Sequence, residues 1–250
     1  MHLKDKTVLI TGGSSGIGAA FARHLAAEGA KLILVARSEA RLAKLKGELA
    51  TEVQILPCDL RVPGAAAKLR AAAGEVDLLI NNAGYATYGL FADTDLAEQS
   101  GEIQVNVTAL VELSHALLPM LEQRRGGIIN VSSITAFHPM PKMAVYAATK
   151  AFILSFSEAL WAEYRERGVT VLALCPGPTE SELFARISET IPGTEVKATA
   201  ESVVREAMRA YHARRSHVVT GWRNRLLAQS FRILPREAAL HLLKRLTMPR

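Results

Sequence analysis

The chain has 250 residues and a mass of 27.1 kDa, with 49% hydrophobic and 22% charged residues. This balance is typical of a globular protein and excludes disordered, collagen-like and low-complexity classes. The net charge of +6 comes entirely from the segment after Thr220, which holds seven Lys or Arg residues and one Glu. The remainder is neutral, so we expect no nucleic-acid partner.

Short apolar runs alternate along the chain with segments of helical spacing. Strands are expected at Val8–Ile10, Lys31–Ala36, Val53–Leu56, Asp77–Ile80, Gly127–Val131, Val169–Leu174 and His217–Thr220. Helices are expected at Ile17–Glu28, Ser38–Ala50, Pro63–Ala73, Ser100–Leu118 (with Pro119 near its end) and Tyr146–Arg167. Apolar strands that are separated by helices indicate a parallel sheet covered on both faces. The sequence therefore predicts an α/β fold with a single doubly wound, Rossmann-like sheet, and residues 1–250 form one domain.

A glycine-rich loop separates the first expected strand from the first helix. Glycines let a backbone approach a phosphate closely, and the positive end of the helix dipole attracts the phosphate. The spacing Gly12-x3-Gly16-x-Gly18 is longer than the common G-x-G-x-x-G fingerprint. The loop is a candidate pyrophosphate site, and its expected binding residues are Gly12, Ser14, Ser15, Gly16, Ile17 and Gly18.

Tyr146 and Lys150 are four residues apart, so both side chains lie on one face of a helix. A phenol with a pKa near 10 is a poor acid or base at neutral pH, and a neighbouring ammonium group favours its phenolate form. The pair can therefore give a proton to a carbonyl oxygen or remove one from an alcohol.

Six motifs occur in the order found in the short-chain dehydrogenase/reductase family, which this chain resembles. They are Thr11-Gly12-x3-Gly16-x-Gly18, Asn81-Asn82-Ala83-Gly84, Asn106, Ser133, Tyr146-x3-Lys150 and Pro176-Gly177. The resemblance implies an NAD(P)-dependent oxidoreductase in which Tyr146 is the general acid/base. It also implies that Ser133 orients the substrate, that Lys150 binds the nicotinamide ribose, and that the backbone of Asn106 holds a water molecule. The spacing of 13 residues before Tyr146 favours Ser133 over Ser132.

The end of the second strand indicates which cofactor is used. The sequence there is Val35-Ala36-Arg37-Ser38, without an acidic residue. An arginine at this place suits the 2′-phosphate of NADP, and NADP-preferring family members similarly carry it, so NADP(H) is expected. By resemblance, the full cofactor set beyond the glycine loop is Arg37, Ser38, Asp59, Leu60, Asn82, Ala83, Gly84, Tyr146, Lys150, Pro176, Gly177 and Thr179.

Three stretches are expected to line the substrate pocket: Tyr85–Phe91, Ile134–Val145 and Thr179–Lys197. Their apolar side chains favour a moderately apolar ketone, aldehyde or alcohol, although the same residues could simply cover the core. The segment at about 180–200 is expected to be a lid over this pocket.

The basic tail at about 222–250 has helical spacing in two halves, which Pro235 separates. It could pack on the body or on a second subunit, or it could rest on an anionic membrane surface. The family resemblance implies a homodimer or homotetramer.

Other functional classes are less consistent with the sequence. A non-catalytic nucleotide-sensing protein of the same fold is the main alternative, but such proteins usually lose the Tyr/Lys pair. The histidines lack the spacing of metal ligands, so no metal is expected. Two cysteines exclude a disulfide framework, and there is no apolar run of membrane-spanning length or apolar signal segment, which together predict a cytoplasmic protein.

Overall fold

The computed structural model describes residues 3–180, 198–233 and 235–247. Its described strands form one seven-stranded parallel sheet in the order β3-β2-β1-β4-β5-β6-β7. They are β1 (Thr7–Thr11), β2 (Lys31–Ala36), β3 (Val53–Pro57), β4 (Leu78–Asn81), β5 (Gly127–Val131), β6 (Thr170–Cys175) and β7 (His217–Val219). The doubly wound parallel sheet is confirmed, and each strand lies within one residue of its predicted range.

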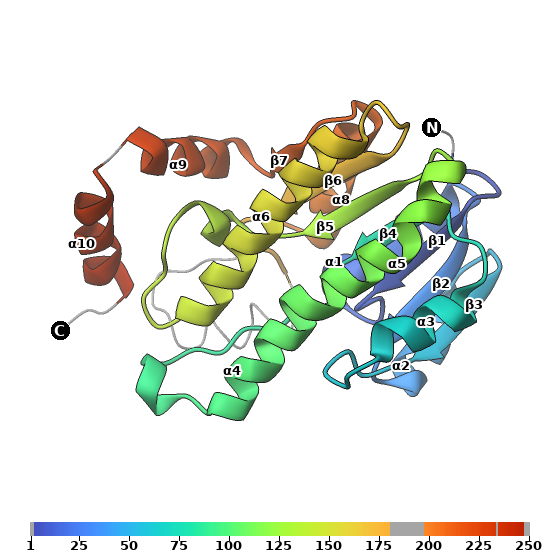
Figure 1. Ribbon diagram of the computed structural model, residues 1–250, viewed down its shortest axis with the longest axis horizontal. Coiled ribbons are helices and arrows are strands. Elements are labelled where there is room, and N and C mark those ends of the chain that lie inside the picture. The colour runs from blue at the N-terminus through green and yellow to red at the C-terminus, as the bar shows by residue number, and fades with distance from the viewer. Residues whose placement is uncertain (1–2, 181–197, 234, 248–250) are drawn as a thin grey trace.

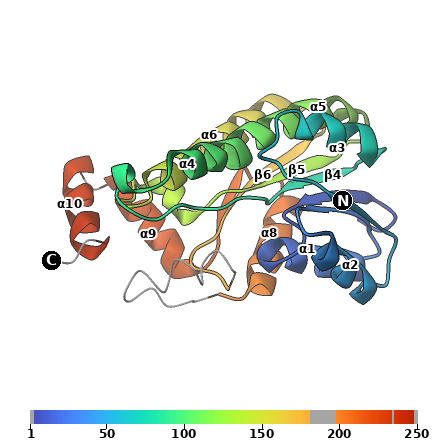
Figure 2. The same cartoon turned by 90° about the horizontal axis from the view of Figure 1, so that it is seen from below.

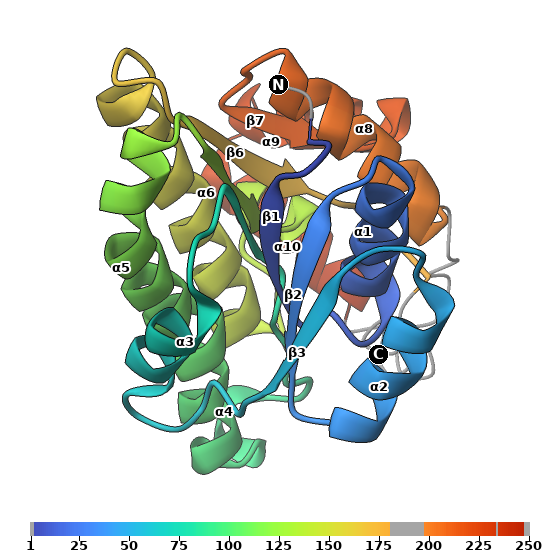
Figure 3. The same cartoon turned by 90° about the vertical axis from the view of Figure 1, so that its right-hand side faces the viewer.

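Helices cover both faces of the sheet. They are α1 (Gly16–Ala27), α2 (Glu39–Glu48), α3 (Ala65–Ala73), α4 (Leu96–Ile103), α5 (Ala109–Gln123), α6 (Ala144–Tyr164), α8 (Ala200–His212), α9 (Trp222–Ile233) and α10 (Arg236–Thr247). Figures 2 and 3 show α1, α2 and α8 on one face and α3, α5 and α6 on the other. The short turns η1 (Phe91–Asp93) and η3 (Ile134–Phe137) follow β4 and β5.

Two hydrophobic cores lie on the two faces because neighbouring strand residues point in opposite directions. Val8 and Ile10 pack with Phe21 of α1, whereas Leu9 packs with Leu113 and other residues of α5 on the far face. All five of these side chains are fully or almost fully buried. Burial of each contributes about 1.5–3 kcal/mol, which fixes the helices against the sheet.

The long helix predicted at Ser100–Leu118 is in fact longer and interrupted. It begins at Leu96 because Asp95 caps it, accepting hydrogen bonds from two backbone N–H groups of the first turn. A π-helical turn, η2 (Gln104–Thr108), then separates α4 from α5. The helix continues past Pro119 to Gln123, since Leu117 and other buried leucines on both sides of the proline hold it against the sheet.

Helix α8 is not among the predicted elements, although its apolar spacing and its Thr199 cap are helical signals. The tail forms α9 and α10, which extend from the body beyond β7 (Figure 1). Helix α9 contacts the body through Ala228, which packs near Phe137 and Leu154, and through an ion pair between Arg225 and Glu206. The described helices include none long and apolar enough to cross a membrane.

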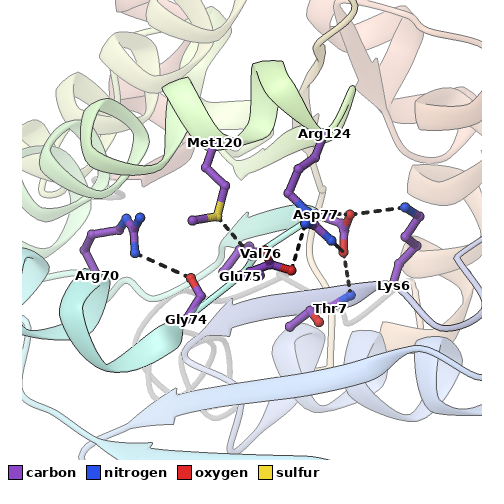
Figure 4. A network of polar contacts seen from close by, with 9 residues as sticks. All are labelled: Lys6, Thr7, Arg70, Gly74, Glu75, Val76, Asp77, Met120 and Arg124. Carbon is purple, nitrogen blue, oxygen red and sulfur yellow. Dashed lines mark hydrogen bonds and ion pairs between the residues drawn. The ribbon is translucent and has the colours of Figure 1, made fainter.

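At the edge of the sheet where the strands begin, a polar network surrounds Asp77 (Figure 4). Its carboxylate is 1% exposed and accepts hydrogen bonds from Arg124, from the backbone N–H of Thr7 and from Lys6. Burial would raise the pKa of Asp77, but these hydrogen bonds outweigh burial, and the pKa lies below its usual value. Asp77 therefore ties β1, β4 and α5 together at the edge opposite to the one where the strands end.

We expect Asp77→Asn to lower the free energy of unfolding by about 2–3 kcal/mol at pH 7, since charge-assisted bonds to three partners are lost. A lowered folded-state pKa gives stability that is present above the unfolded pKa, near 4, and is lost as pH falls through the folded pKa. The deficit of the variant should therefore shrink below about pH 4. Urea unfolding of wild type and variant, at pH 7 and again below about pH 4, measures this effect. Glu75→Gln is the matched control, because Glu75 pairs with Arg124 from an exposed position and should cost under about 0.5 kcal/mol.

Candidate active site

The candidate site lies at the carboxyl ends of the strands, where β1 and β4 are neighbours although the chain leaves them in opposite directions along the sheet. Such a switch point is where doubly wound sheets bind ligands. The loops after β1, β4, β5 and β6 carry most of the predicted site residues to this edge.

The glycine loop is pressed against the loop that follows β4. Gly12 has a φ of 64°, and a Cβ added to it would lie 2.7 Å from Asn82 Nδ2 and 2.9 Å from Ala83 Cα. Asn82 Nδ2 donates to the carbonyls of Thr11 and Gly12, at 2.9 and 3.1 Å. Thr11 Oγ1 accepts from the backbone N–H groups of Asn82 and Ala83, both at 3.0 Å. Only a residue without a side chain fits at position 12, and this explains why the two motifs occur together.

The N-terminus of α1 is open to a ligand. Gly16 starts the helix with a φ of 52°, and Ser15 occupies the N-cap without a side-chain capping bond. Within the part of the chain that the structure describes, the Ser15 hydroxyl and the first N–H groups of α1 are therefore available to an anion. This geometry fits the pyrophosphate of a dinucleotide.

The adjacent strand ends carry positive charge. Arg37 is exposed just after β2, and within the described ranges it makes no hydrogen bond or ion pair. Ser38 caps α2 by accepting from the N–H of Arg41 at 3.4 Å. Arg61 donates hydrogen bonds to the carboxylate of Asp59. These bonds lower the pKa of Asp59, and the positive charge of Arg37 contributes in the same direction. Leu60 is buried beside them. Arg61 is a residue that the sequence motifs did not indicate.

Helix α6 brings together the two predicted groups of the reaction centre. Tyr146 and Lys150 are 8% and 4% exposed, and Lys150 Nζ lies 5.5 Å from the centroid of the Tyr146 ring. Lys150 Nζ donates to the carbonyl of Val131 at 2.9 Å. Ser132 Oγ donates to the backbone carbonyl of Lys150 at 2.7 Å. The helix is thus tied to the end of β5.

Ser133 and Ser132 differ in what they touch. Ser133 stands at the start of η3, where its Oγ accepts from the N–H of Thr135 at 3.2 Å. The Ser133 side chain also lies close enough to Tyr146 to favour the phenolate and so to act on the pKa of the phenol. Ser132 instead supports Lys150 from the side of the backbone. The geometry therefore agrees with the spacing argument that places Ser133, and not Ser132, beside the phenol.

Burial dominates the acid–base properties of the pair. It raises the pKa of Tyr146 to about 12, and the hydrogen bond with Ser133 opposes this only in part. Burial lowers the pKa of Lys150 to about 8, while Glu102 opposes that change. The lowering of the phenol pKa that was expected from Lys150 does not prevail in this chain, because desolvation of the phenolate costs more.

Asn106 lies in the π-helical turn and is 1% exposed. Its Oδ1 accepts from the N–H of Tyr85 at 3.1 Å, and its Nδ2 donates to the Tyr85 carbonyl at 3.0 Å and to Thr149 Oγ1 at 3.1 Å. A Cβ on Gly84 would lie 2.9 Å from Asn106 Oδ1. Asn106 therefore fastens the loop after β4 to α6, one residue before Lys150.

Glu102 is a buried acid that the sequence motifs missed. It lies one helical turn before Asn106 and is fully buried. Its Oε2 accepts from Thr87 N at 2.9 Å and from Thr87 Oγ1 at 2.8 Å, whereas its Oε1 has no partner within the described part of the chain. Burial raises the pKa of Glu102, and the Thr87 hydrogen bonds and the charge of Lys150 oppose this rise.

The loop after β6 closes the site from the other side. Pro176 accepts from the N–H of Ile134 at 2.8 Å, and Thr179 Oγ1 donates to the carbonyl of Gly177 at 2.8 Å. Gly177 packs so closely on Asn224 of α9 that a Cβ would overlap that side chain. The predicted lid lies almost wholly at 181–197, outside the described residues.

Comparison with known proteins identifies the family. The profile described as short chain dehydrogenase matches residues 6–192. The chain belongs to this family. It is 39% identical over 218 residues to a short chain dehydrogenase from Pseudocercospora fijiensis. The alignment covers 83% of this chain and 69% of that relative. It is therefore an NAD(P)-dependent oxidoreductase, and the non-catalytic alternative is not favoured.

Solved structures of the family superpose closely. A 7β-hydroxysteroid dehydrogenase structure gives a TM-score of 0.87 at 27% identity and covers 97% of this chain and 99% of its own. A short-chain dehydrogenase from Sphingobium yanoikuyae in complex with NADPH gives 0.80 at 33% identity, covering 98% of both chains. A 3-ketoacyl-(acyl-carrier-protein) reductase from Brucella melitensis, complexed with NADH, gives 0.78 at 26% identity, covering 87% and 97%. Of these similar structures, one therefore holds NADPH and another holds NADH.

Proposed function

We propose that the protein interconverts a ketone or aldehyde with the corresponding alcohol, uses NADP(H), and acts on a moderately apolar substrate. The observation that carries the proposal is the buried contact of Tyr146 with both Ser133 and Lys150 at the strand ends. The cofactor, when bound, supplies or accepts a hydride at its nicotinamide ring.

The chain's own residues do the remaining work. Ser133 Oγ donates a hydrogen bond to the substrate oxygen and orients the carbonyl. Tyr146 gives its phenolic proton to that oxygen during reduction and takes it back during alcohol oxidation. Charged Lys150 stabilises the phenolate that remains and binds ribose hydroxyls, while Asn106 keeps the loop after β4 in register with α6.

The cofactor would lie along the strand ends. We assign the pyrophosphate to the glycine loop and the N-terminus of α1, and the adenine end to Asp59 and Leu60. Asn82, Ala83 and Gly84 would line the ribose, while Pro176, Gly177 and Thr179 would border the nicotinamide. The proposed preference for NADP rests on Arg37. Its guanidinium makes no hydrogen bond or ion pair within the described ranges and can bind a 2′-phosphate, with the Ser38 hydroxyl beside it.

A panel of ketones and alcohols, monitored by NADPH absorbance, tests the activity, and the Arg37→Ala variant tests the cofactor. We expect wild type to have a higher kcat/KM with NADPH than with NADH. The variant should lose about 10–100-fold in kcat/KM with NADPH, the equivalent of one or two charge-assisted hydrogen bonds, and little with NADH. Lys46→Ala, which removes an exposed cation from the α2 helix that follows Arg37, is the control. A preference for NADH in wild type would contradict the assignment.

We further propose a single-domain, cytoplasmic protein that assembles as a homodimer or homotetramer. The tail presents Trp222, Leu226 and Leu227 on α9 as exposed apolar side chains, next to Arg223. Such a surface suits either a second subunit or an anionic membrane. Sedimentation with anionic vesicles distinguishes the two, because only membrane contact carries the protein into the pellet.

A further inference from the structure

A cavity of about 120 Å³ lies between the loop that follows β4 and the segment that precedes α6. Residues 87–99 form one wall and residues 141–145 the other. Ala144 and Val145 of this lining belong to the first turn of α6, which also carries Tyr146, so the cavity lies close to the helix backbone at the reaction centre. The exposed apolar side chains of Leu90 and Phe91 also line it, which makes it a suitable place for the far end of a substrate.

The polar side chains of the first wall are already bonded within the protein. Thr87 Oγ1 donates to Glu102 at 2.8 Å, and Thr94 Oγ1 donates to the carbonyl of Phe91 at 3.1 Å. Gln99 Nε2 donates to the same carbonyl at 3.0 Å. None of these donors needs a ligand.

Lys142 differs from them. It is half-buried and lines the second wall, and its ammonium group makes no hydrogen bond or ion pair with any residue that the structure describes. The ammonium group lies over the ring of Tyr88, 5.5 Å from the ring centroid. Among the residues that the structure describes, no aspartate or glutamate lines the cavity. An ammonium group has three donors, so this cation is free to bind an anion in a cavity whose other described polar side chains are already bonded.

The backbone at Lys142 has an unusual conformation and is tied to the first wall. Its φ is 65°, a left-handed conformation that costs a non-glycine residue about 1–2 kcal/mol. Its carbonyl accepts from the N–H of Gly89 at 2.9 Å, which pins the two walls together. The backbone from which the cation extends is therefore fixed at the rim of the cavity, while the ammonium group rests against the ring of Tyr88.

We propose that Lys142 binds a carboxylate at the end of the substrate remote from the reacting carbonyl. The substrate class is then an oxo acid or hydroxy acid, in which an apolar stretch separates the carboxylate from the reacting carbon. A space of about 120 Å³ accepts a carboxylate and a few methylene groups, on the basis of about 30 Å³ for a water-sized group. This assignment rests on the proposed oxidoreductase function and adds the substrate class to it.

The test compares linear methyl-ketone acids of increasing length, 5-oxohexanoate to 9-oxodecanoate, with their methyl esters. For the best chain length, we expect wild type to favour the acid by about tenfold in kcat/KM, and rising salt should reduce that ratio. Lys142→Met, which keeps an unbranched side chain one atom shorter but removes the charge, should bring the acid-to-ester ratio close to one. Lys142→Arg should retain most of the preference.

The two proposals fail in different ways. If wild type reduces ester and acid equally, or if Lys142→Met leaves the ratio unaltered, the carboxylate assignment is wrong while the oxidoreductase assignment stands. If no ketone is reduced, the proposed reaction on these substrates fails. Calorimetric binding of the acids in the presence of NADPH then decides the role of Lys142: tighter binding to wild type than to Lys142→Met supports it, and equal or absent binding overturns it.

Discussion

Replacing Tyr146 with phenylalanine is expected to lower kcat for ketone reduction by about 10²–10⁴-fold. The phenol is the buried acid next to Ser133 and Lys150, and general acid–base groups contribute about this much to rate. The ring stays in place, so the dissociation constant for NADPH should change less than about threefold. Steady-state kinetics and fluorescence titration with NADPH measure the two quantities separately.

The control for this substitution is Tyr164→Phe. Tyr164 lies at the end of the same helix, where its ring stacks with Arg167 far from the strand ends. Its loss of a hydroxyl should leave kcat within about a factor of two. A Tyr146→Phe enzyme that keeps more than a third of wild-type kcat would show that the proton comes from another group, and the proposed mechanism would then fail.

The sheet was predictable because each strand is a short apolar run with a turn residue or a helix at its end. β2, Lys31–Ala36, and β5, Gly127–Val131, occur at their predicted residues. The helical region after β4 was less predictable. Its π-helical turn around Asn106 depends on contacts with Tyr85 and Thr149, which are far away in sequence and leave no periodic signal.

The candidate site shows the same division. Motifs indicated Tyr146 and Lys150 because their chemistry requires a fixed spacing along one helix. They did not indicate Glu102, since nothing in the sequence states that it is fully buried. Lys142 lies in a stretch that was expected to line the substrate pocket, but no motif distinguishes it from its neighbours there. The sequence also could not predict whether burial or the nearby charge would determine the pKa of Tyr146. An ammonium group four residues away predicts a lowered phenol pKa, but burial of the phenol raises that pKa instead.

Lys150 should give ketone reduction an alkaline limit near pH 8. The ammonium group must carry its charge to stabilise the Tyr146 phenolate, and burial lowers the pKa of Lys150 to about 8. A base of this kind is charged below its pKa and neutral above it, so kcat/KM for reduction should fall as pH rises through 8. Cys175 is the other titratable group whose charge would act on Lys150. Burial raises the pKa of Cys175 to about 12, so it stays neutral near pH 8.

Glu102→Gln should move this limit to lower pH by about 0.5–1 pH unit. The negative charge of Glu102 favours the charged form of Lys150, and its removal lets the pKa of Lys150 fall further. Glutamine keeps an acceptor for the two Thr87 donors, so the loop should stay in place. Glu98→Gln, an exposed carboxylate on the same α4 helix, should leave the pH profile unaltered. An unshifted limit in Glu102→Gln would mean that Glu102 is already protonated in the working enzyme and carries no charge that Lys150 could sense.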